Sequence, residues 1–182
     1  MKIIDTHIPD VKILKPQVFT DARGYFFESF RQQWFQQHVA NLDFVQTNQS
    51  QSIGGTLRGL HYQRMQPQGK LVRVMSGEIF DVAVDLRQSS PSFGHWTGHI
   101  LSADNHCQMW IPPGFAHGFY VMSDSAECLY QCSDYYAPND EYAIKWNDDT
   151  LAINWPLSSK HSLQLSEKDN QAGNFTDARM FD

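Results

Sequence analysis

The sequence has few cysteines, no long apolar run and no excess of positive charge. Its three cysteines, Cys107, Cys128 and Cys132, are an odd number without CxxC spacing, so we expect reduced core residues rather than a disulfide framework. No run approaches the roughly 18 apolar residues of a membrane span, and residues 1–5 lack the apolar region of a secretory signal. We therefore expect a cytoplasmic protein without a membrane partner.

Three common functional motifs are also missing. The sequence contains no GxGxxG, no GxxxxGK and no GxSxG, which removes the usual signals of dinucleotide binding, nucleotide hydrolysis and serine hydrolysis. Its formal net charge of −6 argues against a nucleic-acid partner, because such partners usually select a basic surface. An anionic ligand could still bind to individual arginines.

The composition is that of a compact globular protein. Hydrophobic residues make up 41% of the 182 residues, aromatic residues 13% and charged residues 19%. This length can bury a single core, and we find no internal repeat, low-complexity tract or linker. We therefore expect one domain over residues 1–182.

Short alternating runs separated by turn residues predict a mainly β protein. The expected strands cover residues 11–16, 44–50, 56–63, 70–75, 78–87, 96–101, 108–111, 118–122, 126–133 and 142–146. In residues 78–87, Phe80, Val82, Val84 and Leu86 share one face, with Asp81 and Asp85 on the other, which predicts a half-buried strand. Even spacing without intervening helices predicts an antiparallel sandwich or barrel.

Two helical segments interrupt this pattern. Phe30, Trp34 and Phe35 have helical spacing, and Ser29 is a candidate N-cap for a helix that runs to about Val39. A shorter helical turn is expected over residues 165–169, with Ser166 as its cap.

Residues 112–117 fit the pattern PxGxxH, which resembles the second motif of the cupins, a family of double-stranded β-helix jelly rolls. Metal-binding cupins join that histidine to an HxH pair, because a transition metal needs three or four converging ligands. Here the earlier position reads His61-Tyr62-Gln63, so the second histidine is missing. We expect an all-β cupin jelly roll with a few short flanking helices and no bound metal.

A series of longer segments resembles the dTDP-4-dehydrorhamnose 3,5-epimerase family in sequence order. The segments are residues 21–24, 56–63, 68–74, 81–87, 111–119, 134–136, 146–148 and 165–169. The resemblance implies a metal-free cupin enzyme without an external cofactor, usually a homodimer, that acts on a dTDP-sugar in rhamnose precursor synthesis. Inversion beside a ketone requires a base on one face of the sugar, an acid on the other and stabilisation of the enolate.

The resemblance also implies roles for individual residues. His61 is the expected base, Asp169 its carboxylate partner, Tyr130 the opposing acid and Lys70 the group that offsets enolate charge. Asp169 has an alternative role in a capping box with Ser166, and Tyr130 could be a core or rim residue. Tyr135 competes locally with Tyr130, although stacking on the thymine or lining the pocket suits it better.

The remaining expected site residues bind the substrate. Arg23 and Arg58 suit a diphosphate because the guanidinium fork matches its oxygens. The resemblance implies that Arg23 and Glu28 reach into the neighbouring subunit's site, although both could be local turn or helix-start residues. Gln46 and Asn48 match positions near the nucleotide but could equally satisfy backbone groups. His117 keeps the cupin position and either hydrogen-bonds in the site or packs in the core.

Three rival functions remain open at this stage. The nearest is a sugar-nucleotide isomerase that epimerises carbon 3 alone or moves the ketone. A metal-dependent cupin oxygenase is less favoured because of Gln63. A non-catalytic jelly roll that binds the sugar nucleotide would show affinity without exchange of carbon-bound hydrogen.

Overall fold

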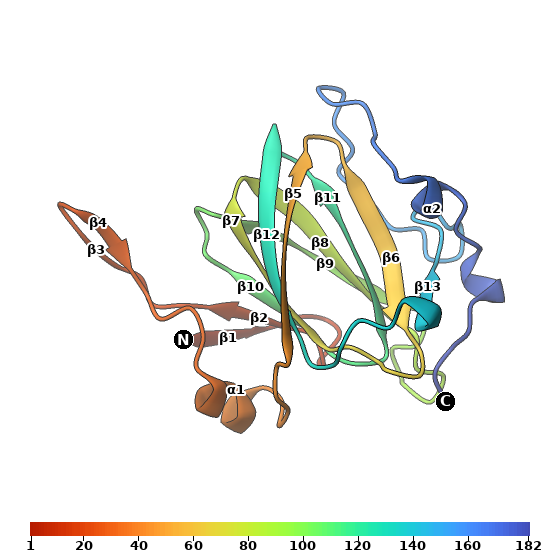
Figure 1. Cartoon of the computed structure of the whole chain (residues 1–182), viewed down its shortest axis with the longest axis horizontal. Helices are drawn as coiled ribbons and strands as arrows, with labels where there is room; N and C mark the ends of the chain where they lie inside the picture. The colour runs from red at the N-terminus through yellow and green to blue at the C-terminus, as the bar shows by residue number, and fades with distance from the viewer.

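Two antiparallel sheets face each other in the computed structural model, which describes all residues from 1 to 182 (Figure 1). The six-stranded sheet has the order β1-β2-β10-β7-β12-β5 and the five-stranded sheet the order β13-β6-β11-β8-β9. From β5 to β13 the chain crosses between the two sheets at every step except from β8 to β9, as in the jelly-roll architecture predicted from the sequence.

Almost every strand and helix expected from the sequence has a counterpart in the structure. The six-stranded sheet consists of β1 (Lys2–Asp5), β2 (Lys12–Lys15), β10 (Gln108–Ile111), β7 (Lys70–Ser76), β12 (Ser125–Cys132) and β5 (Gln46–Ile53). The five-stranded sheet consists of β13 (Glu141–Ala143), β6 (Leu57–Gln63), β11 (Phe115–Val121), β8 (Glu78–Asp85) and β9 (Trp96–Ser102). A separate hairpin is made by β3 (Phe19–Asp21) and β4 (Gly24–Phe26). The helices are α1 (Gln32–His38) and α2 (Glu167–Asn170), with short 3₁₀ turns at Pro138–Asp140 and Phe175–Asp177.

The main core lies between the two sheets. It contains Val72 and Val74 from β7 and Ile79 and Ala83 from β8, all at most 4% exposed. All three cysteines are buried as free thiols, as expected. None of the helices has the length and apolar character needed to cross a membrane.

The prediction for β8 was wrong about which face meets solvent. Asp81 and Asp85 are completely buried on the face that looks between the sheets. The opposite face, with Val82 and Val84, packs under the C-terminal segment through Ile144, Leu151 and Phe175, among others. The alternation was read correctly, but the C-terminal tail covers the outer face, so both faces of the strand are buried.

The predicted start of the first helix was also wrong. α1 begins at Gln32 after Arg31, and no side chain caps it. Ser29 stays outside the helix, with its carbonyl oxygen accepting a hydrogen bond of 2.7 Å from Gln108 Nε2 on β10. By contrast, Ser166 caps α2 as expected and accepts a hydrogen bond from the Asp169 amide.

A glycine allows β6 to approach β11 closely. Gly59 has a φ of +121°, and a Cβ atom there would lie 2.5 Å from the Cα atom of Gly118. Only glycine fits such a position without moving the neighbouring backbone. The two strands therefore pair closely enough to bring His61 and His117 into register as cross-strand partners.

Candidate active site

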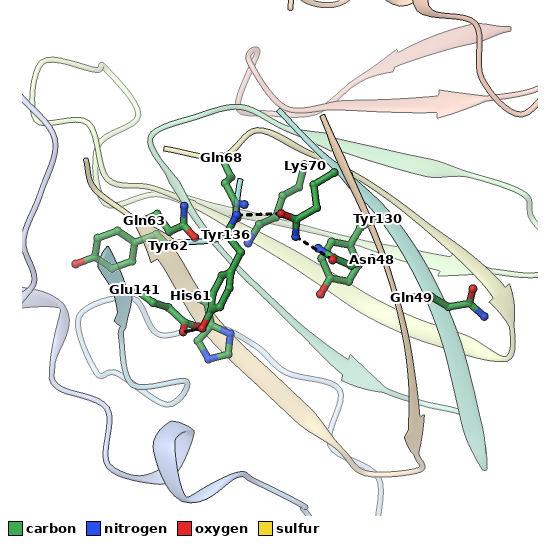
Figure 2. Close-up of a pocket in the computed structure, with 11 residues that line it drawn as sticks. Asn48, Gln49, His61, Tyr62, Gln63, Gln68, Lys70, Tyr130, Tyr136 and Glu141 are labelled. Atoms are coloured by element: carbon green, nitrogen blue, oxygen red, sulfur yellow. Dashed lines mark hydrogen bonds between the residues drawn. The ribbon is translucent and has the colours of Figure 1, made fainter. Parts of the chain in front are cut away.

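A pocket of about 430 Å³ opens between the two sheets (Figure 2). Its walls come from β6 and β13 on one side and from β5, β7 and β12 on the other. The lining residues are Gln46, Asn48, Gln49, His61, Tyr62, Gln63, Gln68, Lys70, Tyr130, Tyr136 and Glu141. The structure thus brings three expected catalytic residues, His61, Lys70 and Tyr130, to one cavity from three different strands.

An adjoining inner recess of about 100 Å³ shares part of this wall. It is lined by Ser50, Arg58, His61, Lys70, His117, Phe119 and Tyr130. Lys70 points into this space because it shares the inward face of β7 with the buried Val72 and Val74. The strand thus delivers a cationic group to the inner recess from the same face that carries core valines.

His61 is held from behind by Asp169. The His61 Nε2 atom lies 2.5 Å from Asp169 Oδ1, and the two residues are 108 positions apart. Asp169 is 2% exposed, whereas 27% of the His61 side chain remains accessible. When Nε2–H donates to the carboxylate, a neutral imidazole carries its lone pair on Nδ1. The arrangement provides a base whose tautomer is fixed by its partner.

Asp169 also takes part in the cap of α2, so it makes the contacts expected of both roles considered for it. Ser166 Oγ donates to Asp169 Oδ2 at 2.7 Å, and the Gly59 amide lies 3.4 Å from Oδ1. Burial raises the pKa of Asp169, but the hydrogen bonds from His61 and Ser166 outweigh it and bring the pKa below its usual value. The carboxylate therefore stays ionised behind His61.

Burial changes the proton affinities of the two other expected catalytic groups. It lowers the pKa of Lys70, while the charges of Cys132, Asp81 and Glu141 oppose that shift. It raises the pKa of Tyr130, which keeps the phenol protonated at neutral pH. A protonated phenol is the form that can act as an acid.

The expected binding residues Gln46, Asn48, Arg58 and His117 also lie at the site. Gln46 Nε2 donates to Asn48 Oδ1 at 3.0 Å, so the two amides form a pair on β5 in the pocket wall. Arg58 reaches the recess and donates to Ser52 Oγ at 3.1 Å. His117 Nε2 lies 2.7 Å from Asp81 Oδ1.

The other three expected residues lie outside this pocket. Tyr135 is 60% exposed and does not line the cavity; its neighbour Tyr136 does. Arg23 sits on the β3–β4 hairpin, where it pairs with Asp21 at 2.7 Å, and Figure 1 shows this hairpin extending away from both sheets. Glu28 pairs with Arg31 at 2.6 Å.

The sequence analysis missed a polar group at the pocket mouth. Glu141 Oε2 accepts a hydrogen bond of 2.7 Å from the Tyr136 hydroxyl, visible in Figure 2, and lies 2.5 Å from Lys168 Nζ. Burial raises the pKa of Glu141, but hydrogen bonds from Lys168 and Tyr136 lower it overall. No spacing rule points to these residues, because Tyr136 precedes β13, Glu141 begins it and Lys168 reaches them from α2, which comes much later in the chain.

Gln63 occupies the position where a metal-binding cupin has its second histidine. Its Nε2 group donates to the carbonyl oxygens of Gln66 at 2.8 Å and Tyr135 at 3.1 Å, and its Oε1 atom accepts from the Ala137 amide at 2.9 Å. No three His, Cys, Asp or Glu side chains are grouped so that they could hold a metal ion. The Gln63 side chain therefore forms hydrogen bonds within the chain.

The family model of dTDP-4-dehydrorhamnose 3,5-epimerase matches residues 5–177. This chain belongs to that family. Among its relatives, the dTDP-4-dehydrorhamnose 3,5-epimerase of Pseudomonas aeruginosa is 54% identical over 182 residues, covering 100% of this chain and 99% of that protein. The epimerase of Neisseria gonorrhoeae is 58% identical over 93% of this chain, but the match spans only 51% of that longer protein.

A solved structure of the same family has the same fold. The dTDP-6-deoxy-D-glucose-3,5-epimerase of Legionella pneumophila, in complex with dTDP-4-keto-L-rhamnose, superposes with a TM-score of 0.95 at 50% identity. The alignment covers 98% of this chain and 94% of that one. The likeness confirms the predicted cupin jelly roll and the predicted epimerase family.

Proposed function

We propose that this chain inverts dTDP-4-dehydro-6-deoxy-D-glucose at carbons 3 and 5 to give dTDP-4-dehydro-L-rhamnose. The observation that carries the proposal is the His61–Asp169 contact of 2.5 Å at the wall of a pocket that also contains Lys70 and Tyr130. Family membership supplies the substrate, since the relatives are named for this epimerisation.

The first step removes a proton beside the ketone. His61 Nδ1 takes the hydrogen of carbon 5 or carbon 3, and the bonding electron pair moves onto the carbon-4 oxygen to give an enolate. Asp169 stabilises the imidazolium that forms, because its carboxylate already accepts the Nε2 proton. The ammonium group of Lys70, which lines the inner recess, offsets the charge on the enolate oxygen.

The second step returns a proton to the opposite face. Tyr130 lies on β12, in the sheet across the pocket from His61 on β6, so its hydroxyl is suited to protonate the face away from the base. The phenolate takes its proton back from solvent and His61 releases its own. Because the proton leaves and returns without a change of oxidation state, the scheme needs no external cofactor.

The nucleotide part of the substrate uses the polar walls of the same cavity. Gln46 and Asn48 offer amides for the thymine or ribose, and Arg58 offers a guanidinium fork for the diphosphate. Tyr136 supplies an exposed aromatic ring at the mouth, the stacking role first expected of Tyr135.

Deuterium exchange from solvent tests the base. We expect His61→Asn, shown to be folded by its melting temperature, to incorporate deuterium at carbons 3 and 5 about 10²- to 10⁴-fold more slowly than the unchanged protein. His38→Asn, on the exposed end of α1, serves as the matched control and should exchange normally. Exchange at the unchanged rate in His61→Asn would rule out this mechanism, and inversion at carbon 3 alone would favour a mono-epimerase.

We also propose a homodimer in which the β3–β4 hairpin of each subunit completes the other's pocket. The hairpin exposes Phe19, Tyr25 and Phe26 by 55%, 63% and 71%, a concentration of aromatic surface typical of an interface. Arg23 and Glu28 lie outside the pocket of their own chain, so they can contribute to binding only in a partner's site.

Mixed dimers test this exchange. Arg23→Ala and His61→Asn subunits, each nearly inactive alone, are co-expressed with different tags and purified as mixed dimers. If Arg23 acts across the interface, one of the two sites in each mixed dimer is intact, and about half of the normal activity per dimer returns. If Arg23 acts within its own chain, neither site is intact and no activity returns. A monomer by analytical ultracentrifugation would also refute the dimer.

The expected cytoplasmic location fits this proposal. The three buried thiols suit a reducing compartment, and a nucleotide-sugar substrate is made where nucleotides are available. Fractionation of cells that express the tagged chain from its natural start would test the location.

A further inference from the structure

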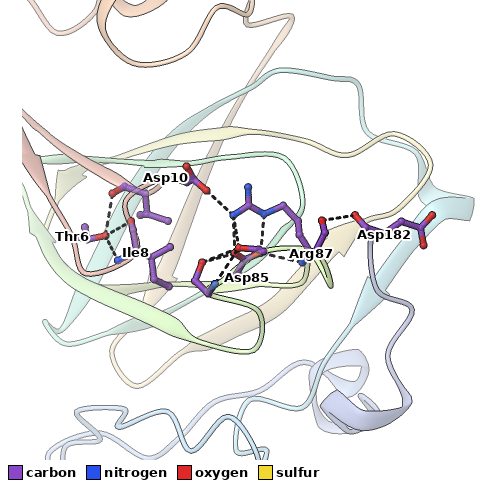
Figure 3. Close-up of polar contacts among 10 residues, drawn as sticks. Thr6, Ile8, Asp10, Asp85, Arg87 and Asp182 are labelled. Atoms are coloured by element: carbon purple, nitrogen blue, oxygen red, sulfur yellow. Dashed lines mark hydrogen bonds and ion pairs between the residues drawn. The ribbon is translucent and has the colours of Figure 1, made fainter.

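Asp81 is a completely buried carboxylate that only one side chain satisfies. Its Oδ1 atom lies 2.7 Å from His117 Nε2, whereas its Oδ2 atom has no hydrogen-bond partner in the chain. Asp85, four residues along on the same face of β8, is equally buried but accepts hydrogen bonds from Arg87, Ser90 and Ser92, as Figure 3 illustrates for Arg87. The two aspartates share burial and strand but differ in how well the fold satisfies them.

A buried carboxylate with an unpaired oxygen destabilises the fold, so its presence calls for a reason other than stability. Asp85 has a structural reason to be there, because it ties together the end of β8 and the following turn. Asp81 ties nothing to the backbone, and its one contact is a histidine that lines the inner recess. The presence of Asp81 is therefore better explained by a role in the pocket than by a contribution to the stability of the fold.

We propose that Asp81 is a positioning residue of the active site, which holds His117 through Nε2 so that Nδ1 faces the sugar bound in the recess. The inference rests on the function proposed above. Nδ1 has no partner within the chain, and His117 is the residue directly opposite His61 across the β6–β11 pairing. The site thus has two histidines, each fixed from behind through Nε2 by a buried carboxylate.

The charged neighbours of Asp81 leave His117 as its only direct partner. His99 lies opposite Asp81 in the β8–β9 register but is not hydrogen-bonded to it. Lys70 on β7 is close enough for an electrostatic effect but forms no ion pair with it. Arg58 and Tyr130 face the same recess from β6 and β12. His117 is therefore the only group near the bound sugar to which Asp81 is hydrogen-bonded.

The test compares Asp81→Asn with Asp85→Asn, a matched control on the same strand face. We expect Asp81→Asn to reduce the rate of deuterium incorporation by at least 10-fold while its melting temperature is unchanged or higher. Asp85→Asn should show the reverse pattern, with a lower melting temperature and an unchanged rate in the folded protein. A lower melting temperature and an unchanged rate for Asp81→Asn would overturn the proposal.

A double-mutant cycle with His117→Gln checks that Asp81 acts through His117. The rate loss from Asp81→Asn should shrink to less than 2-fold when His117 is already replaced, and a full loss in that background would refute the route. If Asp81→Asn does not fold, Asp81→Ser, which keeps a small polar group, takes its place in the same cycle.

The ¹⁵N resonances of His117 report its tautomer without any reaction. They should show a protonated Nε2 and a free Nδ1 in the unchanged protein, and a mixture of tautomers in Asp81→Asn. The same spectrum in both proteins would refute the positioning role. Because this readout does not depend on turnover, absence of exchange in the unchanged protein would refute the proposed function separately.

Discussion

The ion pair between Asp85 and Arg87 should make the free energy of unfolding of this protein fall at low pH (Figure 3). Asp85 is fully buried and lies 2.8 Å from Arg87 Nε and 2.7 Å from Arg87 Nη2, while Ser90 and Ser92 also donate to it. Burial raises the pKa of Asp85, but these hydrogen bonds outweigh it and lower the pKa from 3.8 to about 2. Arg87 extends the network to Asp10, 2.7 Å away in the N-terminal segment.

The size of the effect follows from the pKa difference. One pKa unit corresponds to about 1.4 kcal/mol, so a shift from 3.8 to about 2 contributes about 2 kcal/mol to the free energy of unfolding. Because the pKa is lower in the folded state, this contribution is complete well above pH 4 and is lost as the pH falls towards 2. About half of it should remain at pH 3.

Urea unfolding followed by tryptophan fluorescence measures this contribution. We expect Asp85→Asn to unfold with a free energy about 2 kcal/mol lower than the unchanged protein at pH 7, and the difference should shrink to about 1 kcal/mol at pH 3. Asp124→Asn removes an exposed carboxylate that is paired with Lys160 and should follow the unchanged protein at every pH. The same difference at pH 7 and pH 3, or none at pH 7, would refute the reasoning.

Three other substitutions test the site and its support. Lys70→Met should lower kcat by about 10²- to 10³-fold with KM within a few-fold, measured by steady-state kinetics, because it removes the charge opposite the enolate. Gly59→Ala should lower the yield of folded protein and its melting temperature, since its Cβ would lie 2.5 Å from Gly118 Cα; a normal melting curve would contradict the close approach. Gln63→His should lower the free energy of unfolding by about 2 to 4 kcal/mol through lost amide hydrogen bonds and should not bind stoichiometric zinc or iron by elemental analysis.

Most of the fold could be predicted from local patterns, and the errors came from contacts distant in sequence. Alternation and turn residues located the strands, since each depends on neighbours within a few positions. The start of α1 was missed because Gln108, on β10, holds the Ser29 carbonyl outside the helix. The aspartate face of β8 was misjudged because the C-terminal tail, about 60 to 100 residues later, buries the other face.

The site was predictable only as far as the family resemblance reached. No spacing rule joins His61 to Asp169, which are 108 residues apart, and that contact follows from the docking of α2 beside β6. The resemblance supplied this pair together with Lys70 and Tyr130. It gave no reason to choose Asp81 or Glu141, whose importance depends on burial and on which side chains they meet.

Gln63 stands where a metal-binding cupin has a histidine ligand, and its amide has a structural role there instead. A histidine at this position would present one ring nitrogen to a metal and could not replace both the donors and the acceptor of an amide. The Gln63 amide binds the backbone of Gln66, Tyr135 and Ala137, and so fixes the segment that carries Tyr136 to the pocket mouth. The Tyr136 hydroxyl in turn donates to Glu141, which lies on β13 beside the strand that carries His61. Because the amide is 4% exposed and uses both ends, restoring a metal ligand here would dismantle the mouth of the pocket before it could complete a metal site.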